Sequence, residues 1–136
     1  MDLKEIFDGF DPAKYEQEAK QRWGHTDAYK ESVRRTKRYT KEDWLKIKAE
    51  QGDVYRDAAA AMKAGKKPSD PEVMDIAERH RLAIDRWFYP CSSMMHRGLA
   101  SMYETDERFA ATIDKAGEGL TPFLVAAIRA NADRAR

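Results

Sequence analysis

The side chains of this chain that could carry out chemistry are one cysteine and three histidines, and His80, Cys91 and His96 lie close together in the sequence. A thiol becomes a nucleophile when a nearby base or charge activates it, and His96 follows Cys91 by five residues with no supporting motif. The same three residues could hold a metal ion, but their spacing matches no established ligand pattern. A glycine-rich phosphate loop is also missing from the sequence. We therefore expect ligand binding rather than catalysis, and neither enzyme activity nor a metal or cofactor.

The stretch from Trp87 to Tyr103 is the most apolar and sulfur-rich part of a chain in which 36% of the residues are charged. Pro90 cannot donate a backbone hydrogen bond and restricts the residue before it, so one helix should end near Phe88 and another should begin near Cys91. Methionine side chains adapt to irregular partners. Beyond the break, the helical spacing predicts one soft stripe, formed by Cys91, Met94, Met95, Gly98, Met102 and Tyr103.

Two residues of this region each allow two interpretations. Gly98 costs a helix about 1 kcal/mol relative to Ala, so we expect either a close helix crossing or a ligand to approach the backbone there. His80 lies on the apolar face of the preceding helix, where it is either a hydrogen-bonded core residue or a ligand contact. Histidine is also an axial ligand of haem, but nothing else in the sequence supports a haem site.

Composition limits the class of protein. At 136 residues the chain is long enough for a single domain with its own core. Good helix formers dominate, glycine and proline are few, and strand-like alternation is absent, which predicts an all-α fold. The net charge of +1 argues against a bulk attraction to nucleic acid or membrane. One cysteine, no signal peptide and no membrane-length apolar run indicate a cytoplasmic protein without membrane contact.

Helix start and stop signals divide the chain into about seven helices. Thr40 with Asp43 three residues later forms a capping-box pattern, Ser69-Asp70-Pro71 predicts another helix start, and Gly65 a helix end. The predicted helices cover residues 12–23, 27–39, 41–64, 71–88, 91–103, 106–116 and 121–130.

The N-terminal part differs from the rest of the chain. Up to residue 43 its larger aliphatic side chains are only Leu3, Ile6 and Val33, so it buries little surface alone and pays the entropy of ordering. We expect residues 1–45 to form mobile, ligand-responsive helices and residues 46–136 to form the helical core. A basic cluster within this part is either a solvated face or, less favoured, a phosphate-binding patch; it consists of Arg34, Arg35, Lys37 and Arg38.

Several short segments resemble, in the same order, the antibiotic-recognition domain of the thiostrepton-induced TipA family. They are residues 23–29 (Trp-Gly-His-Thr-Asp-Ala-Tyr), 39–44 (Tyr-Thr-Lys-Glu-Asp-Trp), 77–81 (Ala-Glu-Arg-His-Arg), 89–91, 95–96, 102–103, 106–109 and 119–120. The resemblance implies a globin-like helical bundle without haem, and N-terminal helices that close over an antibiotic. It also implies a bacterial cytoplasmic protein that senses or sequesters small-molecule antibiotics.

The resemblance carries further expectations about partners and chemistry. In the family's full-length regulators, this domain follows a MerR-type winged-helix DNA-binding domain and a dimerising coiled coil. Neither is in this sequence, so DNA is expected to be contacted only through that absent N-terminal domain, and the domain itself is expected to be monomeric. The family's thiopeptide-binding founder captures its ligand through a cysteine that falls at Gly98 here, whereas Cys91 matches a different family cysteine. Covalent capture by that route is therefore expected to be absent.

The predicted ligand cleft lies between the Trp87–Tyr103 region and the N-terminal helices. Aromatic side chains bury a large area while few torsions are frozen, which suits a lid that orders on binding. The predicted function is non-enzymatic binding of hydrophobic, macrocyclic or peptide-like antibiotics, either for a MerR-type activator or for a stand-alone resistance binder. A helical module that binds a peptide or protein remains the alternative. The candidate ligand-binding residues are Trp23, Tyr29, Trp44, His80, Trp87, Cys91, Met94, Met95, Gly98, Met102 and Tyr103.

Overall fold

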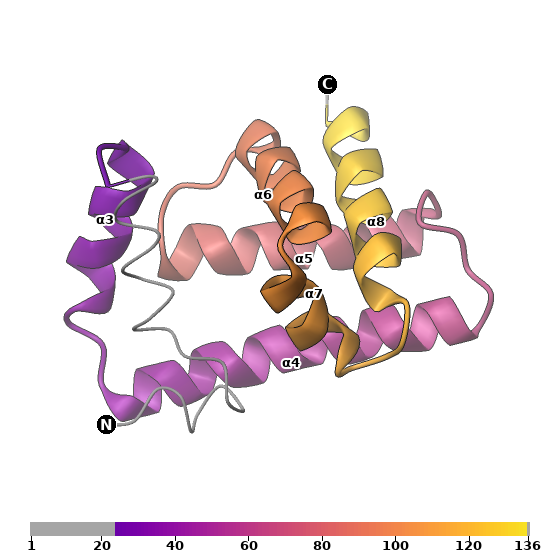
Figure 1. Cartoon of the computed structure of the whole chain (residues 1–136), viewed down its shortest axis with the longest axis horizontal. Coiled ribbons are helices and arrows are strands. Elements are labelled where there is room, and N and C mark those ends of the chain that lie inside the picture. Colours follow the sequence, from indigo (N-terminus) through magenta and orange to yellow (C-terminus); the bar gives the residue numbers. More distant parts are fainter. Residues whose placement is uncertain (1–23, 136) are drawn as a thin grey trace.

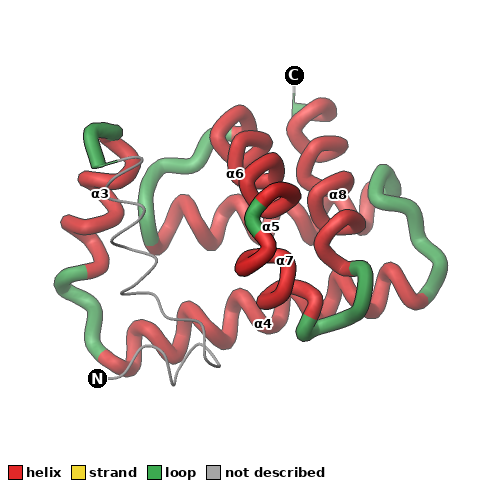
Figure 2. Tube along the Cα trace, viewed as in Figure 1, coloured by secondary structure: helices red, strands yellow, loops and turns green. Residues whose placement is uncertain are grey.

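The computed structural model describes residues 24–135, and every regular element within them is a helix (Figure 2). The helices are α3 (Asp27–Thr36), α4 (Lys41–Lys63), α5 (Pro71–Trp87), α6 (Ser93–Thr105), α7 (Glu107–Asp114) and α8 (Leu120–Arg134). The all-α prediction is thus confirmed, and each of these helices lies within a few residues of a predicted one. The helix predicted over residues 12–23 lies outside the described residues.

The helices α4 and α5 form an antiparallel pair, and α6, α7 and α8 lie across it (Figure 1). Two ion pairs fix the antiparallel register, because Glu50 binds Arg86 at 2.6 Å and Asp57 binds Arg79 at 2.7 Å. The core lies between these layers, and small side chains let the helices approach closely. Its most buried members are Val54, Ala58, Val73, Ala77, Ala100, Ile113, Leu120, Leu124, Val125, Ala127 and Ile128.

Local signals set most helix ends. The predicted capping box at α4 is present, because Thr40 Oγ1 accepts the Asp43 N–H at 3.2 Å and Asp43 Oδ2 accepts the Thr40 N–H at 2.9 Å. Gly65 follows α4 with a φ of +79°, in the left-handed region that suits glycine. At α5 the outcome differs in detail, since Asp70 stands at the N-cap but its carboxylate accepts the N–H of Lys67 at 2.9 Å.

Two predicted starts are displaced by a residue or two. The last helix begins at Leu120 rather than at Thr121, because Thr121 Oγ1 bonds Asp114 at 2.8 Å and Gly119 takes the N-cap with a φ of +81°. The helix predicted from Cys91 begins at Ser93 instead. Ser92 caps it by accepting the N–H of Met95 at 3.1 Å, which leaves Cys91 in the connection before the helix.

Helix α3 stands at one end of the molecule and has no buried residue (Figure 1). Polar contacts hold it on the C-terminal turn of α5: Arg35 Nη1 donates to the carbonyl oxygen of Asp85 at 2.7 Å, and the Tyr39 hydroxyl donates to that of Trp87. Arg35 is therefore a structural residue rather than part of a solvated face. Whether residues 1–45 act as a mobile lid remains a prediction.

Arg35→Met should loosen α3 without unfolding the core. A hydrogen bond from a charged donor contributes about 1.5–3 kcal/mol, so the local opening free energy of α3 should fall by about that amount. Amide hydrogen exchange over residues 27–36 measures it. Arg34→Met is the matched control, because Arg34 bonds Glu31 of its own helix at the surface and does not anchor α3 to α5. Equal exchange rates in the two variants would contradict this anchoring role.

Candidate functional site

An aromatic cluster joins the α3–α4 connection to α4 and to the end of α5, and it is formed by Tyr39, Trp44, Trp87 and Phe88. Tyr39 packs edge-on against Trp44 and Trp87, with ring centroids 5.7 Å apart in each case, and Trp44 lies 6.3 Å from Phe88. All four side chains are half-buried. The structure thus brings together the predicted site residues Trp44 and Trp87.

Glu50 orients this cluster from the neighbouring turn of α4. Its carboxylate accepts the indole N–H of Trp87 at 2.8 Å and also binds Arg86 at 2.6 Å. The indole ring is therefore held in place from α4. Sequence reasoning left Tyr39 and Phe88 out of the candidate site, although Tyr39 opens one of the resemblance segments.

A second group of rings lies inside the bundle. His80 and His96 are 4% and 1% exposed, and Nδ1 of His80 lies 2.8 Å from Nε2 of His96. Tyr103 meets His80 edge-on at 5.9 Å, and Tyr55 lies 6.1 Å from it on the other side. His80 is thus buried and hydrogen-bonded in the core, and its role as a ligand contact remains a prediction.

Burial keeps this histidine pair neutral. It lowers the pKa of both imidazoles below their ordinary value, and the nearby His80 and Arg81 lower the pKa of His96 further. One ring N–H therefore donates to the lone pair of the other ring. Burial also raises the pKa of the Tyr55 hydroxyl to about 12. The group is a neutral polar contact between α5 and α6, and residues 24–135 add no third metal-ligating side chain to it.

The soft stripe does not form one face, which corrects the sequence prediction. Helix α6 packs inward through His96, Ala100 and Tyr103, because these residues follow one another at helical spacing. Met94 is consequently 82% exposed and Met95 37% exposed. The other members are divided between core and connection: Met102 packs against the core, Tyr103 is buried within it, and Cys91 precedes the helix.

Gly98 lies on the exposed side of α6, in open space. A Cβ atom built there would meet no heavy atom within 4 Å, apart from the helix's own backbone and chain neighbours. The interpretation of Gly98 as a close helix-crossing residue is therefore wrong. Ala100, with no exposed surface, is the small residue of α6 that packs into the core. Met94, Met95 and Gly98 together form an exposed surface that we call the methionine face of α6.

Cys91 is an unreactive thiol. It is 1% exposed, its N–H donates to Asp85 Oδ1 at 2.8 Å, and its carbonyl oxygen accepts Arg81 Nη1 at 2.7 Å. Burial raises the pKa of the thiol to about 11. A protonated, enclosed thiol is a poor nucleophile, so the structure provides no activated cysteine in residues 24–135.

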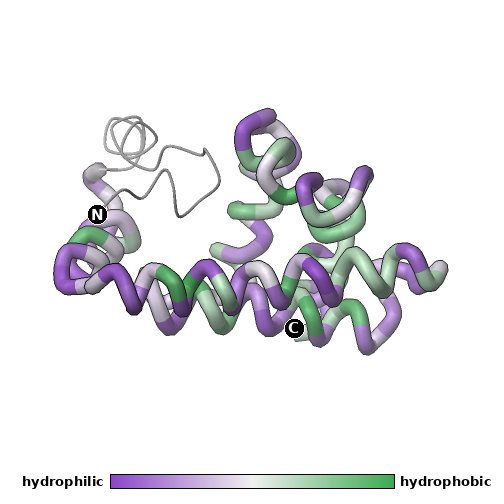
Figure 3. Tube along the Cα trace, turned by 90° about the horizontal axis from the view of Figure 1, so that it is seen from below, coloured by the Kyte–Doolittle hydropathy of each residue, from purple (hydrophilic) through white to green (hydrophobic). Residues whose placement is uncertain are grey.

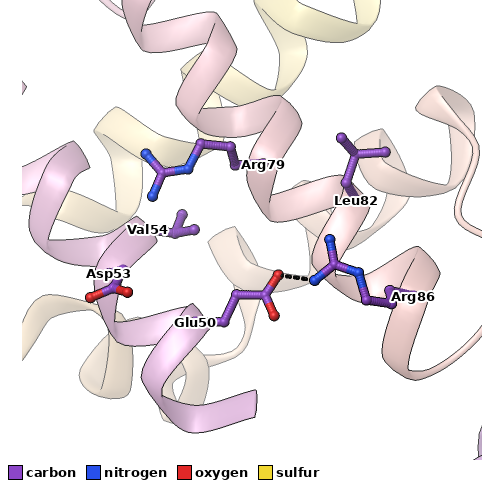
Figure 4. Close-up of a pocket in the computed structure, with 6 residues that line it drawn as sticks. All are labelled: Glu50, Asp53, Val54, Arg79, Leu82 and Arg86. Carbon is purple, nitrogen blue, oxygen red and sulfur yellow. Dashed lines mark hydrogen bonds and ion pairs between the residues drawn. The ribbon is translucent and has the colours of Figure 1, made fainter. Parts of the chain in front are cut away.

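A pocket of about 260 Å³ opens between α4 and α5 (Figure 4). Its lining combines apolar with charged side chains, namely Glu50, Asp53, Val54, Arg79, Leu82 and Arg86. None of the predicted ligand-binding residues lines this pocket. Glu50 and Arg86 connect it to Trp87 of the aromatic cluster, and it is smaller than the roughly 300–1,000 Å³ of usual small-molecule sites.

The two predicted residues from the N-terminal part are less informative. Tyr29 is half-buried on α3, and its backbone N–H donates to Thr26 Oγ1 at 3.2 Å, so Thr26 caps the helix. Trp23 lies outside the described residues. The ligand-contact roles of all these residues remain predictions. No described helix is long and apolar enough to cross a bilayer.

Comparison with characterised proteins gives consistent matches. The family described as the TipAS antibiotic-recognition domain matches residues 15–131. The chain is 48% identical over 131 residues to the HTH-type transcriptional activator TipA of Streptomyces coelicolor, covering 96% of this chain and 51% of that protein. It is 40% identical over 114 residues to the HTH-type transcriptional activator mta of Bacillus subtilis, covering 84% and 43%. The chain thus spans about half the length of these relatives.

Solved structures agree. The structure of Streptomyces lividans TipAS in complex with nosiheptide, a thiopeptide antibiotic, superposes with a TM-score of 0.93 at 45% identity, covering 98% of this chain and 93% of that one. The antibiotic-binding domain of a TipA-class multidrug resistance transcriptional regulator matches with a TM-score of 0.62 at 41% identity, covering 68% and 98%. The globin-like helical fold is therefore confirmed, and the chain belongs to the TipAS antibiotic-recognition domain family.

Proposed function

We propose that this chain binds peptide-like macrocyclic antibiotics without altering them chemically, and that it acts as the effector-sensing domain of a transcription activator. The observation that carries the proposal is the TM-score of 0.93, at 45% identity, to a TipAS domain that holds nosiheptide. Similarity at that level extends over 98% of this chain, so it includes the surroundings of any shared binding site.

Two surfaces suit such a ligand. The aromatic cluster offers half-buried indole and phenol rings, which gain contact area when an apolar ligand covers them. The methionine face of α6 offers flexible, polarisable side chains, with Met94 82% exposed. The connection after α5 links the two surfaces, since it runs from Phe88 to Ser92. A macrocycle that contacts both would bury apolar surface on α5 and α6 at once.

Chemical modification of the ligand is not part of the proposal. Cys91 is enclosed and protonated, and His80 and His96 bond to each other, so residues 24–135 present no pair of nucleophile and base. A thermal-shift panel of macrocyclic antibiotics, followed by mass spectrometry of the recovered compounds, tests both halves of the proposal. We expect stabilisation by a macrocycle that is recovered intact. Stabilisation by none, or product formed in proportion to protein, would contradict it.

At the level of the whole regulator, the proposal follows from the relatives. They are HTH-type activators about twice as long as this chain, so we infer that DNA binding and dimerisation belong mainly to a further N-terminal part. The domain alone would be a monomer. A regulator of bacterial transcription would work in the cytoplasm, where its promoter is.

Gly98→Leu should weaken antibiotic binding by at least about tenfold, which corresponds to 1.4 kcal/mol, and should leave the domain folded. The methionine face would lose the open space beside Met94 and Met95, whereas the fold tolerates a side chain that meets no neighbour. Replacing a mid-helix glycine should even stabilise α6 slightly. Fluorescence titration gives the affinity and circular dichroism gives the fold.

Ala60→Leu is the matched control for this variant, because it adds the same side chain at an exposed, small residue of α4 rather than on the methionine face of α6. It should leave the affinity unchanged. Equal affinities of the wild type and Gly98→Leu would show that the ligand binds away from the methionine face. Unfolding of Gly98→Leu would contradict the open space observed there.

A further inference from the structure

The positive charge of this chain is concentrated around α3. Between residues 27 and 41 the only carboxylates are Asp27 and Glu31, which leaves this short segment with a net charge of +4. Because the whole chain carries +1, the remaining residues carry −3. Figure 3 shows the α3 end of the molecule coloured mainly as hydrophilic. The cations of the segment are Lys30, Arg34, Arg35, Lys37, Arg38 and Lys41.

Two of these cations already have structural partners. Arg35 bonds the carbonyl oxygen of Asp85 and, together with Arg34, binds Glu31 at 2.7 Å. These contacts neutralise Glu31, the only acid near the middle of the helix, and they hold its pKa at about 2. The net positive charge of the segment therefore comes from the other four cations.

The other four cations have no such partners. Lys30, Lys37, Arg38 and Lys41 are exposed, and none forms an ion pair within the part of the chain that the structure describes. Lys30, Arg34 and Arg38 follow one another at four-residue spacing, so they share one side of α3 and its C-terminal turn. We call these five exposed cations, with Arg34 included, the basic face of α3; Lys30 and Arg34 lie in the helix, Lys37 and Arg38 follow it, and Lys41 begins α4.

The composition of the basic face fits a polyanion better than a protein partner. Protein interfaces have an apolar centre rich in aromatic residues, and lysine is depleted there. On α3 the only exposed large apolar side chain is Val33, 37% exposed, while three of the five cations are lysines. Long, hydrated cations without an apolar anchor are the usual contacts to nucleic-acid phosphates.

The length of the face also suits a nucleic-acid backbone. Helix α3 extends about 15 Å at the helical rise of about 1.5 Å per residue, and the connection after it adds Lys37 and Arg38. Phosphates on one DNA strand recur about every 3.4 Å along the axis. The basic face can therefore reach several successive phosphates.

We propose that the basic face of α3 contacts the phosphate backbone of DNA. The inference rests on the proposed function, in which this domain belongs to a DNA-binding regulator. It goes beyond the expectation that DNA is contacted only through a separate domain. These contacts carry no base specificity, and they add salt-dependent affinity to whatever sequence recognition the regulator has. They also place α3, the helix with no buried residue, against the nucleic acid.

Fluorescence anisotropy of a short labelled DNA duplex of arbitrary sequence tests the inference on the whole chain. Binding should be measurable at low salt. The logarithm of the association constant should fall with the logarithm of the salt concentration with a slope of about −3 to −4, as expected for about four phosphates. Lys37→Glu/Arg38→Glu should weaken binding at least about tenfold. Circular dichroism checks that the variant is folded.

Lys63→Glu/Lys67→Glu is the matched control. It changes the net charge by the same amount, its residues are exposed, and Lys63 lies in the last turn of a helix as Lys37 lies at a helix end. Because both double variants change the net charge equally, any effect of net charge alone is common to them. The control should therefore bind DNA much more tightly than Lys37→Glu/Arg38→Glu, within about twofold of the wild type. Equal losses in the two variants, or no binding at low salt, would overturn the inference.

A competition assay distinguishes DNA from an acidic protein partner. A polyglutamate chain of matched charge should displace the labelled duplex poorly, because its carboxylates do not reproduce the spacing of phosphates along a DNA strand. Displacement at equal charge concentration would overturn the inference in favour of an acidic protein partner.

Nosiheptide titration of the same variants distinguishes failure of this inference from failure of the proposed function, because it is independent of DNA. If DNA binding fails while nosiheptide still binds, then only this inference is lost. Loss of nosiheptide binding in the wild type would instead count against the proposed function.

Discussion

The Gly98→Cys variant is expected to gain the full mass of a dehydroalanine-bearing thiopeptide, while the wild type gains none. The new thiol would stand in open space on the methionine face, where a solvated cysteine keeps a pKa near about 8.5 and a usable thiolate fraction. Its thiolate would add to the dehydroalanine β-carbon and the α-carbon would take up a proton, so no atom leaves. The wild-type Cys91 cannot compete, because it is 1% exposed and protonated.

Intact-protein mass spectrometry reads this result directly. Ala60→Cys is the control, since it puts an exposed thiol on α4 rather than on the methionine face of α6. We expect an adduct with Gly98→Cys within the time that leaves Ala60→Cys unmodified. Equal labelling of both variants would indicate simple exposure of a thiol, and no labelling of Gly98→Cys would remove the methionine face from the binding site.

Acid should destabilise the domain well before its carboxylates titrate. Burial lowers the pKa of His80 and His96 in the folded state, so the unfolded chain takes up protons near about pH 6.5 that the folded chain does not. Stability is therefore full above about pH 6.5 and is lost as the pH falls toward the folded pKa values. Each histidine can contribute up to about 1.4 kcal/mol per pH unit, so the pair can cost about 2–3 kcal/mol per unit.

Urea unfolding at several values between about pH 7.5 and pH 5 measures this loss. Glu78 does not interfere in that range, because its ordinary pKa of 4.5 is lowered to about 2 by Arg81 and its stabilising effect is lost only in stronger acid. A free energy of unfolding that stays constant from neutral pH to pH 5 would show that the histidine pair is not buried in solution.

Local sequence signals predicted the helices well. Thr40 with Asp43, Pro71 and Gly65 act within one helical turn, so their effects do not depend on the rest of the fold. The start of α8 was misplaced because Thr121 is used in a tertiary contact with Asp114 rather than in a cap. Propensity alone cannot register such a contact.

The candidate site was predicted less completely. Trp44 and Trp87 both pack against Tyr39, which was left out because its hydroxyl finds the Trp87 carbonyl only through the packing of the α3–α4 connection on α5. The stripe prediction failed because the cap at Ser92 shifts the helix past Cys91, and because Ala100 rather than Gly98 packs inward. The prediction that the ligand is an antibiotic rested on the family resemblance, since no arrangement of apolar side chains specifies one ligand.

Calorimetric titration of the chain with nosiheptide tests the antibiotic-binding function most directly. We predict saturable binding with one ligand per chain, a dissociation constant of about 1 μM or lower, and a negative heat-capacity change from buried apolar surface. The wild-type complex should dissociate fully on denaturation, because no thiol captures the ligand. Absence of saturable heat at protein concentrations of about 100 μM, with the chain shown to be folded, would contradict that function.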